Sequence, residues 1–411
     1  MAFLFKAGRL LDPRQGVLRE NVDVLVEGDK IREVSDRPLS ANGATVINLH
    51  GKVIMPGLID CHVHVFLSEV ALRRLETVPL TLMTAQAAVA MRRTLLRGFT
   101  TVRDTGGADA GIREAVARGL LPGPRLFIAG QVISQTGGHG DWRAHTETEI
   151  GCVCCSALAY CARIADGVPD MIKAVRDELR KGADHIKLTV SGGVASQNDP
   201  LESVQFRMDE IEAACEEANR WGKYVAAHAY STEAIQRAVR AGVRSIEHGN
   251  LMDEATAQLM AEKGAFLVPT LVTYDSMRRR AREFGMSAYS LEKNTKVLAG
   301  GLHSLELCRR AGVEIGFGTD LLGQLEDDES REFLIRAEVE HPVDILRSAT
   351  LVNARILCQE GRLGELVPGA LADLLVVDGD PLADLNLLQD QGVHLPLIMQ
   401  AGVPVKNNLK A

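Results

Sequence analysis

The sequence lacks any hydrophobic run long enough to cross a membrane. No apolar stretch of the chain approaches the roughly 20 consecutive residues that a membrane-spanning helix needs. The N-terminal segment MAFLFKAGRLLDPRQG also has no basic region followed by an apolar core and a cleavage site of small residues, which a secretory signal peptide would have. We therefore expect a cytoplasmic protein with no membrane association.

Positive charge is scarce relative to negative charge. The 411 residues include 46 Lys and Arg against 54 Asp and Glu, which gives a formal net charge of −8. This balance argues against a general affinity for nucleic acid or anionic lipid. With 46% hydrophobic and 24% charged residues, the chain has the composition of a soluble globular protein with a large core. We expect chemistry on a small molecule and no nucleic-acid partner.

The eight cysteines lack the spacing of a structural zinc site. Four of them, Cys152, Cys154, Cys155 and Cys161, crowd into GCVCCSALAYC, but the paired CxxC knuckles of such sites are missing. A cytoplasmic chain of this size also needs no disulfide bonds. We expect free thiols in a helix or lid, with a soft-metal site as the alternative.

Short apolar segments alternate with longer helical patterns between about residues 54 and 320. Such alternation is typical of parallel βαβ units, and eight units in roughly 250 residues is the size of a closed (β/α)8 barrel. An open doubly wound sheet is the alternative, but no GxGxxG motif follows the first segment. The prediction is an α/β fold with a (β/α)8 TIM barrel over residues 54–361. The expected strands lie at residues 53–64, 99–104, 124–130, 185–190, 224–230, 243–249, 265–270 and 313–320.

Short strands with polar turns are predicted at both ends of the chain. The N-terminal part contains FKAGRLLD, NVDVLVEGDKIREV and ATVINLHGK, and the tail contains GELVPGALADLLVVDGDP and LPLIMQAGVPVK. Their shared alternation and turn chemistry predict that residues 1–53 and 362–411 pair as one small β-sandwich domain beside the barrel.

Histidines and a carboxylate occur where the predicted barrel strands end. The first strand ends with His62 and His64, whose side chains point to the same side because strand side chains alternate. The fifth and sixth strands end near His228 and His248, and the eighth ends at Asp320. The strand C-termini form the catalytic face of such a barrel, and imidazole and carboxylate are preferred ligands of zinc and its neighbours. The set predicts a divalent metal centre.

A lysine lies in the middle of the predicted fourth strand, HIKLTV. Burial of a charged ammonium is costly, so Lys187 must be paired, displaced to the surface or held neutral. A neutral lysine can add carbon dioxide to give a carbamate, whose two oxygens can bridge two metal ions. We expect this modification because Lys187 lies on the same rim as the histidines. A lysine that reaches solvent or forms a salt bridge is the alternative.

Together these motifs resemble the amidohydrolase superfamily of metal-dependent hydrolases. The resemblance covers the whole chain, from GKVIMPGLIDCHVH at the start of the barrel to PGALADLLVVDGDP in the C-terminal sheet. It implies two divalent metal ions, expected to be Zn²⁺, and assembly into a homo-oligomer. It also implies the ligands, which are His62, His64 and Asp320 for one ion, His228 and His248 for the other, and Lys187 as N6-carboxylysine between them.

Several residues are candidates for catalysis or substrate binding. Asp320 is expected to take the proton of the attacking water and pass it to the leaving nitrogen. His139, in the glycine-rich stretch SQTGGHGD, is expected to stabilise the oxyanion, and Tyr230, in HAYS, to donate to the substrate carboxylate or the oxyanion. Gly192 and Gly193, in SGGVAS, would let a substrate pass close to the backbone. The alternatives are a surface histidine, a packing tyrosine and an ordinary tight turn.

Four stretches narrow the resemblance within the superfamily. SQTGGHGD, VSGGVASQNDP, HAYS and IEHGN look most like the binuclear peptidase branch that cleaves dipeptides and N-acyl amino acids, which includes Xaa-Pro dipeptidases and Xaa-Arg or Xaa-Lys carboxypeptidases. The neighbouring imidazolonepropionases and deaminases usually work with one metal and no bridging lysine, so Lys187 argues against both. A non-catalytic assembly module would be marked by missing ligands, and none is missing.

Within that branch we expect an Xaa-Pro dipeptidase, or prolidase. An enzyme that cleaves next to Arg or Lys needs an acidic pocket for the cation, and no acid adjoins HAYS or SGGVAS. Asp199, or the run Glu326, Asp327 and Asp328, could supply such a pocket through folding. A basic-residue carboxypeptidase and an N-acyl amino acid hydrolase therefore stay open as alternatives.

Overall fold

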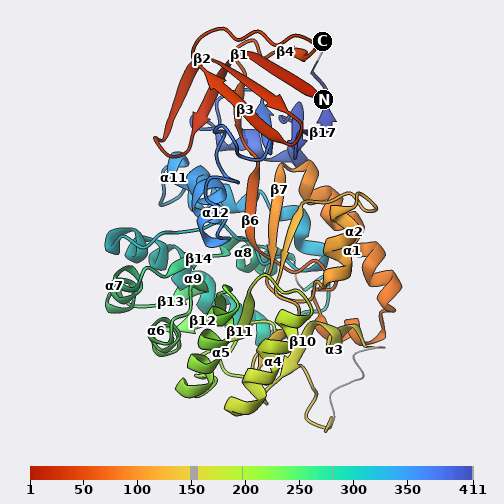
Figure 1. The fold of residues 1–411 in the computed structure, drawn as a ribbon. Helices are drawn as coiled ribbons and strands as arrows, with labels where there is room; N and C mark the ends of the chain where they lie inside the picture. Colours follow the sequence, from red (N-terminus) through yellow and green to blue (C-terminus); the bar gives the residue numbers. More distant parts are fainter. Residues whose placement is uncertain (149–155, 197, 281, 410–411) are drawn as a thin grey trace.

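The computed structural model of the chain describes residues 1–148, 156–196, 198–280 and 282–409. Figure 1 shows a strand-rich layer that holds both chain termini and, next to it, a larger body of strands surrounded by helices. Of the clustered cysteines, Cys152, Cys154 and Cys155 lie outside the described residues, and Cys161 is a buried free thiol.

Both ends of the chain contribute to one eight-stranded mixed sheet. Its central strand β5 is parallel to β1 and antiparallel to β15, so it joins the N-terminal strands to the C-terminal ones. Side chains from both groups, such as Phe5, Val24 and Leu374, are buried in a shared apolar core. The strands are β1 (Ala2–Asp12), β2 (Val17–Glu27), β3 (Lys30–Ser35), β4 (Thr45–Asn48), β5 (Val53–Pro56), β15 (Leu374–Val377), β16 (Leu397–Gln400) and β17 (Val403–Asn407).

Two parallel sheets occupy the middle of the chain. One has the order β6-β7-β8 and the other the order β10-β9-β11-β12-β13-β14. Most of these strands are buried on both faces, as expected where helices cover a parallel sheet, whereas β8 and β10 are partly exposed. The strands are β6 (Leu58–Val63), β7 (Phe99–Asp104), β8 (Arg125–Ile128), β9 (Val132–Ser134), β10 (Ala162–Ile164), β11 (Ile186–Thr189), β12 (Val225–Ser231), β13 (Ser245–Leu251) and β14 (Phe266–Val268).

Residues 313–320 lie between β14 and β6. The Gly316 N–H donates to the Leu267 carbonyl at 2.8 Å, and the Cys61 N–H donates to the Phe317 carbonyl at 2.8 Å. The segment was expected to be a full strand, but it forms only an isolated parallel bridge to Leu267. Its glycines explain this close packing, because a Cβ on Gly318 would lie 2.4 Å from a Val268 methyl and 2.8 Å from the His62 Cβ.

The first expected strand, residues 53–64, is divided in two. β5 belongs to the mixed sheet and β6 to the parallel sheet, and the chain passes from one to the other at Gly57. A Cβ on Gly57 would lie 2.2 Å from the Thr100 hydroxyl oxygen, so only glycine allows this approach to β7. His62 therefore lies in the short strand β6, which begins where the two sheets meet, and His64 follows directly after its end.

In the described part of the chain, twelve α-helices follow or flank these strands. α6 is representative, because Ala234, Ile235, Ala238 and Val239 form its buried face and Gly242 ends it in a left-handed conformation (φ 98°). None of the described helices is long and apolar enough to span a membrane. The helices are α1 (Leu80–Leu96), α2 (Ala110–Ala117), α3 (Ala157–Cys161), α4 (Val168–Arg180), α5 (Met208–Arg220), α6 (Thr232–Ala241), α7 (Glu254–Lys263), α8 (Leu271–Arg280), α9 (Ala288–Ala311), α10 (Arg331–Arg336), α11 (Pro342–Arg347) and α12 (Asn353–Ile356).

Candidate active site

The predicted metal ligands meet at the C-terminal ends of the parallel strands. β6 carries His62 and is followed by His64, β11 carries Lys187, and β12 and β13 carry His228 and His248. Together with Asp320 they line one pocket, here called the inner pocket, with an open space of about 620 Å³. The remaining lining is largely apolar, and it consists of Leu67, Leu72, Val132, His139, Gly140, Trp142, Thr189, Val194, Ala195, Tyr230, Tyr274, Met277 and Leu322.

Asp320 lies at the centre of this cluster. Its Oδ1 is 3.4 Å from His62 Nε2 and 3.3 Å from His64 Nε2, and its Oδ2 is 4.0 Å from His248 Nδ1. Potential ligand atoms of His62, His248 and Asp320 all lie within 4.8 Å of one another. Although burial opposes ionisation, the surrounding histidines hold the pKa of Asp320 well below its ordinary value. The geometry thus provides an ionised carboxylate among imidazoles, which suits a divalent cation.

Each of the four histidines has one ring nitrogen held by a protein group. This arrangement orients the ring and leaves the second nitrogen for a metal, and the second nitrogen of His64 also lies 3.3 Å from the Thr105 hydroxyl. Burial lowers the pKa of His62, His228 and His248, which favours the neutral form that binds metals, whereas Asp320 outweighs burial and raises the pKa of His64. The partners are Glu247 Oε2 for His62 Nδ1 (2.7 Å), the Gly106 carbonyl for His64 Nδ1 (2.8 Å), the Gly192 carbonyl for His228 Nε2 (3.0 Å) and the Thr270 hydroxyl for His248 Nδ1 (2.8 Å).

Lys187 is buried among these ligands, with 3% of its surface exposed. Its Nζ has no hydrogen-bond partner among the described residues. Burial lowers the pKa of Lys187 to about 8, while Glu247 and Asp320 act in the opposite direction. A buried amine without a partner is costly, and a carbamate with two metal ions would remove that cost. The Lys187 environment therefore fits the predicted metal centre.

His139 lies in the loop that follows β9 and packs against the metal-ligand candidates. Its ring stacks on His228 with centroids 4.3 Å apart, and its Nδ1 is 2.7 Å from the Ser196 hydroxyl. Burial, followed by the charge of Lys293, lowers the pKa of His139 to about 3. Lys293 itself donates to three backbone carbonyls, those of Gly193, Ser196 (2.7 Å) and Asp199 (3.1 Å), and so fixes the loop beside His139.

The two glycines predicted to face the substrate have a demonstrable packing role. A Cβ on Gly192 would lie 1.8 Å from the Pro200 carbonyl oxygen, and a Cβ on Gly193 would lie 2.0 Å from the His139 ring. The described residues that line the inner pocket include Val194 and Ala195 of this loop but neither glycine. Substrate contact by Gly192 and Gly193 stays a prediction.

Tyr230 lines the inner pocket together with a residue that the sequence analysis missed. The Tyr230 hydroxyl is 2.8 Å from the hydroxyl of Tyr274, and the Tyr230 ring meets His228 edge-on at 4.8 Å. Burial raises the pKa of both phenols well above the ordinary value, so both keep their protons. Tyr274 is the fourth residue of α8 and belongs to no motif, so no sequence signal pointed to it.

Arg103 and Glu247 form a second feature that the sequence analysis missed. Both side chains are fully buried, and Arg103 donates to the two carboxylate oxygens of Glu247 at 2.8 and 2.9 Å. The signal was present in FTTVRD, because an arginine in a buried strand requires a carboxylate partner. Glu247 in turn accepts a hydrogen bond from His62. The Arg103–Glu247 pair therefore helps to hold the His62 ring in its orientation.

The amidohydrolase family model matches residues 53–401 of the chain. The chain belongs to the amidohydrolase family. This amidohydrolase is similar to a crystal structure of another amidohydrolase, with 50% identity, a TM-score of 0.97 and 100% of both chains covered. A prolidase solved with N-methylphosphonate-L-proline is 47% identical, with a TM-score of 0.97 over 99% of this chain and all of the other. Ochratoxinase from Aspergillus niger is 30% identical over 93% of this chain and 82% of that protein.

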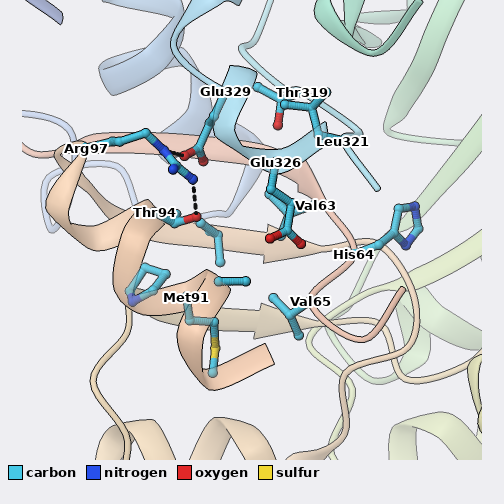
Figure 2. Close-up of a pocket in the computed structure, with 13 residues that line it drawn as sticks. Val63, His64, Val65, Met91, Thr94, Arg97, Thr319, Leu321, Glu326 and Glu329 are labelled. Carbon is cyan, nitrogen blue, oxygen red and sulfur yellow. Dashed lines mark hydrogen bonds and ion pairs between the residues drawn. The ribbon is translucent and has the colours of Figure 1, made fainter. Parts of the chain in front are cut away.

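The acidic run of this amidohydrolase lies outside the inner pocket. Glu326 lines a second pocket of about 390 Å³, which shares His64 with the inner pocket and also contains Arg97 and Glu329 (Figure 2). Asp327 is exposed near Arg97, and Asp328 accepts hydrogen bonds from Ser276 and Arg279. We refer to this second space as the rear pocket.

Asp199 also lies outside the lining of the inner pocket, where it forms structural hydrogen bonds. It is buried, and its Oδ2 accepts from the Gly193 N–H at 3.0 Å and from the Gln205 amide at 3.2 Å. Asp320 is therefore the one carboxylate among the described residues that line the inner pocket. Neither acidic group considered for a basic-residue pocket contributes to that lining.

Proposed function

We propose that this amidohydrolase is a binuclear metal-dependent prolidase that cleaves the amide bond of Xaa-Pro dipeptides. The observation that carries the proposal is the inner pocket, where four histidines and Lys187 surround one carboxylate and the other walls are mainly apolar. An apolar wall suits the proline ring, whereas a cationic side chain would meet, among the described lining residues, no carboxylate other than the proposed metal ligand Asp320. Similarity to the prolidase solved with a proline phosphonate supports the same substrate class.

The proposed metal ligands follow the predicted assignment. His62, His64 and Asp320 would hold one ion, His228 and His248 the other, and Lys187, as N6-carboxylysine, both; we expect Zn²⁺. Two divalent ions bound there would lower the pKa of a water and polarise the scissile carbonyl. The orphaned Lys187 Nζ and the oriented histidine rings support this set.

We assign the proton transfer, the stabilisation of the oxyanion and the binding of the substrate carboxylate to three side chains of the inner pocket. Asp320 takes the proton from the attacking water and delivers it to the leaving proline nitrogen. In the tautomer that we propose, His139 carries its proton on Nε2 and can donate it to the oxyanion, while Nδ1, which lies 2.7 Å from the Ser196 hydroxyl, is the acceptor. Tyr230, still protonated, donates to the proline carboxylate. Both assignments rely on the position of these groups in the inner pocket.

The fold that we propose is a closed (β/α)8 barrel over residues 54–361, with residues 1–53 and 362–411 forming a β-sandwich domain. The bonds of residues 313–320 to both β14 and β6 support closure. A further bond from the Asp184 N–H to the Ile128 carbonyl, at 2.7 Å, connects the two parallel sheets on the other side. Because β5 extends to Pro56 in the mixed sheet, the two domains share a strand at their boundary. A cytoplasmic location and a homo-oligomer complete the proposal.

N-acyl amino acid hydrolysis is the second candidate function. Ochratoxinase is similar over most of the chain, and its name denotes action on a different compound from a dipeptide. The apolar lining from Leu67, Leu72 and Trp142 favours an uncharged acyl group. Side-by-side assays of Ala-Pro and N-acetyl-proline distinguish the two functions.

The test of the proposal is a chelation cycle. Protein purified without chelator is assayed for metal content and for release of proline from Ala-Pro, then stripped of metal and reloaded with Zn²⁺. We expect about two ions per chain and activity that is lost and recovered with them. Proline release that persists in fully stripped protein would contradict the proposal.

A further inference from the structure

The ion pair of Arg103 and Glu247 is fully buried and contacts His62 at its Nδ1. Glu247 and Arg103 have 0% of their side chains exposed. Besides Glu247, the Arg103 guanidinium donates to the Cys61 carbonyl at 2.6 Å and to the Ser245 hydroxyl at 3.0 Å. The Ser245 hydroxyl in turn donates a hydrogen bond to Glu247 Oε1 at 2.6 Å. The Glu247 carboxylate is therefore held in position by two donors, Arg103 and Ser245, in addition to its hydrogen bond with His62.

His62 differs from the other three histidines in the charge of its partner. His64 and His228 bond to backbone carbonyls and His248 to a hydroxyl, whereas His62 Nδ1 donates to the Glu247 carboxylate. A carboxylate can only accept, so it places the proton on Nδ1 and leaves the His62 Nε2 lone pair facing Asp320. A negatively charged acceptor also makes the imidazole a stronger electron donor at its other nitrogen.

We propose that Glu247, held in place by Arg103 and Ser245, is a positioning residue that strengthens His62 as a metal ligand and thereby raises the affinity of one ion above that of the other. The inference rests on the metal-dependent function proposed above. It concerns residues that would touch neither substrate nor metal and that act through His62.

A second buried ion pair in the same chain provides a matched control. Arg336 donates to both carboxylate oxygens of Glu340 at 2.6 and 2.9 Å, and to the Gly316 carbonyl and the Ser348 hydroxyl. Its two side chains are 0% and 2% exposed, so loss of the Glu340 charge leaves a buried arginine unpaired, as loss of the Glu247 charge does. Among the described residues, the Glu340 carboxylate accepts hydrogen bonds from Arg336 and from no histidine of the inner pocket.

The experiment compares Glu247→Gln, Ser245→Ala and Glu340→Gln with the wild type. Zn²⁺ affinity of each stripped protein is measured by competition with a fluorescent chelator, and the stability of the stripped proteins is measured by urea unfolding. We expect Glu247→Gln to bind one of the two ions about 10- to 100-fold more weakly. Ser245→Ala keeps the charge but loses one donor, so we expect a loss of about two- to fivefold. Glu340→Gln should lose stability but keep Zn²⁺ affinity within about twofold.

Activity at saturating Zn²⁺ supplies an independent readout. If Glu247 acts through metal affinity, kcat of Glu247→Gln on Ala-Pro rises towards that of the wild type as Zn²⁺ increases, with KM little changed. Unchanged Zn²⁺ affinity in Glu247→Gln would overturn the inference, and so would an equal loss in Glu340→Gln. Should Glu247→Gln fail to fold, unchanged affinity in Ser245→Ala overturns it. A wild type that binds Zn²⁺ and cleaves Ala-Pro keeps the proposed function intact in all of these outcomes, whereas a wild type without Zn²⁺ defeats both.

Discussion

The inner and rear pockets share His64 but place their charges in opposite ways. In the inner pocket, imidazoles and Lys187 surround Asp320, the one carboxylate among the described lining residues. In the rear pocket, the carboxyl groups of Glu326 and Glu329 lie with Arg97, whose Nε donates to Glu329 at 2.6 Å (Figure 2). Acids only six to nine positions after Asp320 thus never reach the inner pocket. An acidic residue can contribute to substrate selection only if its side chain lines the inner pocket. Closeness to Asp320 in the sequence does not ensure this.

The largest expected difference between the two pockets is the effect of removing one carboxylate charge from each. Asp320→Asn keeps an oxygen at the position but loses the proton acceptor, so we expect kcat on Ala-Pro to fall by about 10³-fold or more. The matched change Asp327→Asn, at an exposed carboxylate beside Arg97 of the rear pocket, should leave kcat unchanged. Metal content is measured alongside. An Asp320→Asn enzyme with both ions and near-normal kcat would refute the proton-transfer role.

Removal of the buried lysine tests the metal side of the comparison. Lys187→Ala should bind at most about one ion per chain where the wild type binds about two, because the proposed bridging ligand is gone. Lys296→Ala, which removes an exposed lysine paired with Glu202, serves as the control. Elemental analysis of chelator-free preparations gives the answer. Equal metal content in the wild type and in Lys187→Ala would rule out the bridging role.

A smaller effect is expected for the tyrosine pair of the inner pocket. Tyr230→Phe removes a donor to the proline carboxylate, and we expect kcat/KM on Ala-Pro to fall by about 10-fold. Tyr274→Phe leaves that donor in place and removes only its 2.8 Å partner, so its effect should be weaker. If both variants matched the wild type, Tyr230 would have only a packing role.

For the rear pocket, we expect an effect on how the free energy of unfolding depends on pH. Burial raises the pKa of Glu326 from an ordinary 4.5 to about 8, with Arg97 opposing. The folded protein therefore holds a proton that the unfolded chain has released, and the free energy of unfolding falls as pH rises from about 4.5 to about 8. Glu326→Gln should flatten this decline by on the order of 2 kcal/mol and change kcat less than twofold. Urea titrations at pH 5 and pH 8 measure this decline, and an unaltered slope would contradict a partly buried, protonated Glu326.

The strand-end residues could be predicted from the sequence because parallel strands place their C-terminal ends together. His62, His64, His228, His248 and Asp320 were recognisable for that reason, and the family resemblance that they carry is confirmed. The buried Lys187 was informative because a charge in an apolar strand demands a chemical explanation.

The sequence could not place Glu247 because the strand pattern fails there. Simple alternation puts Glu247 and His248 on opposite faces of β13, yet both contribute to the same cluster. His248 has a positive φ of 77°, and Asp320 one of 50°, so the backbone departs from an extended strand at two of the site residues. Such left-handed residues carry strain that the surrounding contacts must offset, and no pattern of apolar residues reveals it. The directions in which the acidic side chains of residues 326–328 point could not be predicted either. They are set by a 3-10 turn at Gly323–Asp328, which the pattern of apolar residues does not reveal.

The most direct test of the account is a substrate panel that compares Ala-Pro, Ala-Leu and Ala-Arg under identical metal loading. An inner pocket whose one carboxylate is Asp320 should favour Ala-Pro over Ala-Arg by about 100-fold or more in kcat/KM, because the guanidinium would be desolvated without a partner. A kcat/KM for Ala-Arg equal to or above that for Ala-Pro would contradict the account, because it would require an acidic subsite that the inner pocket does not contain among its described residues.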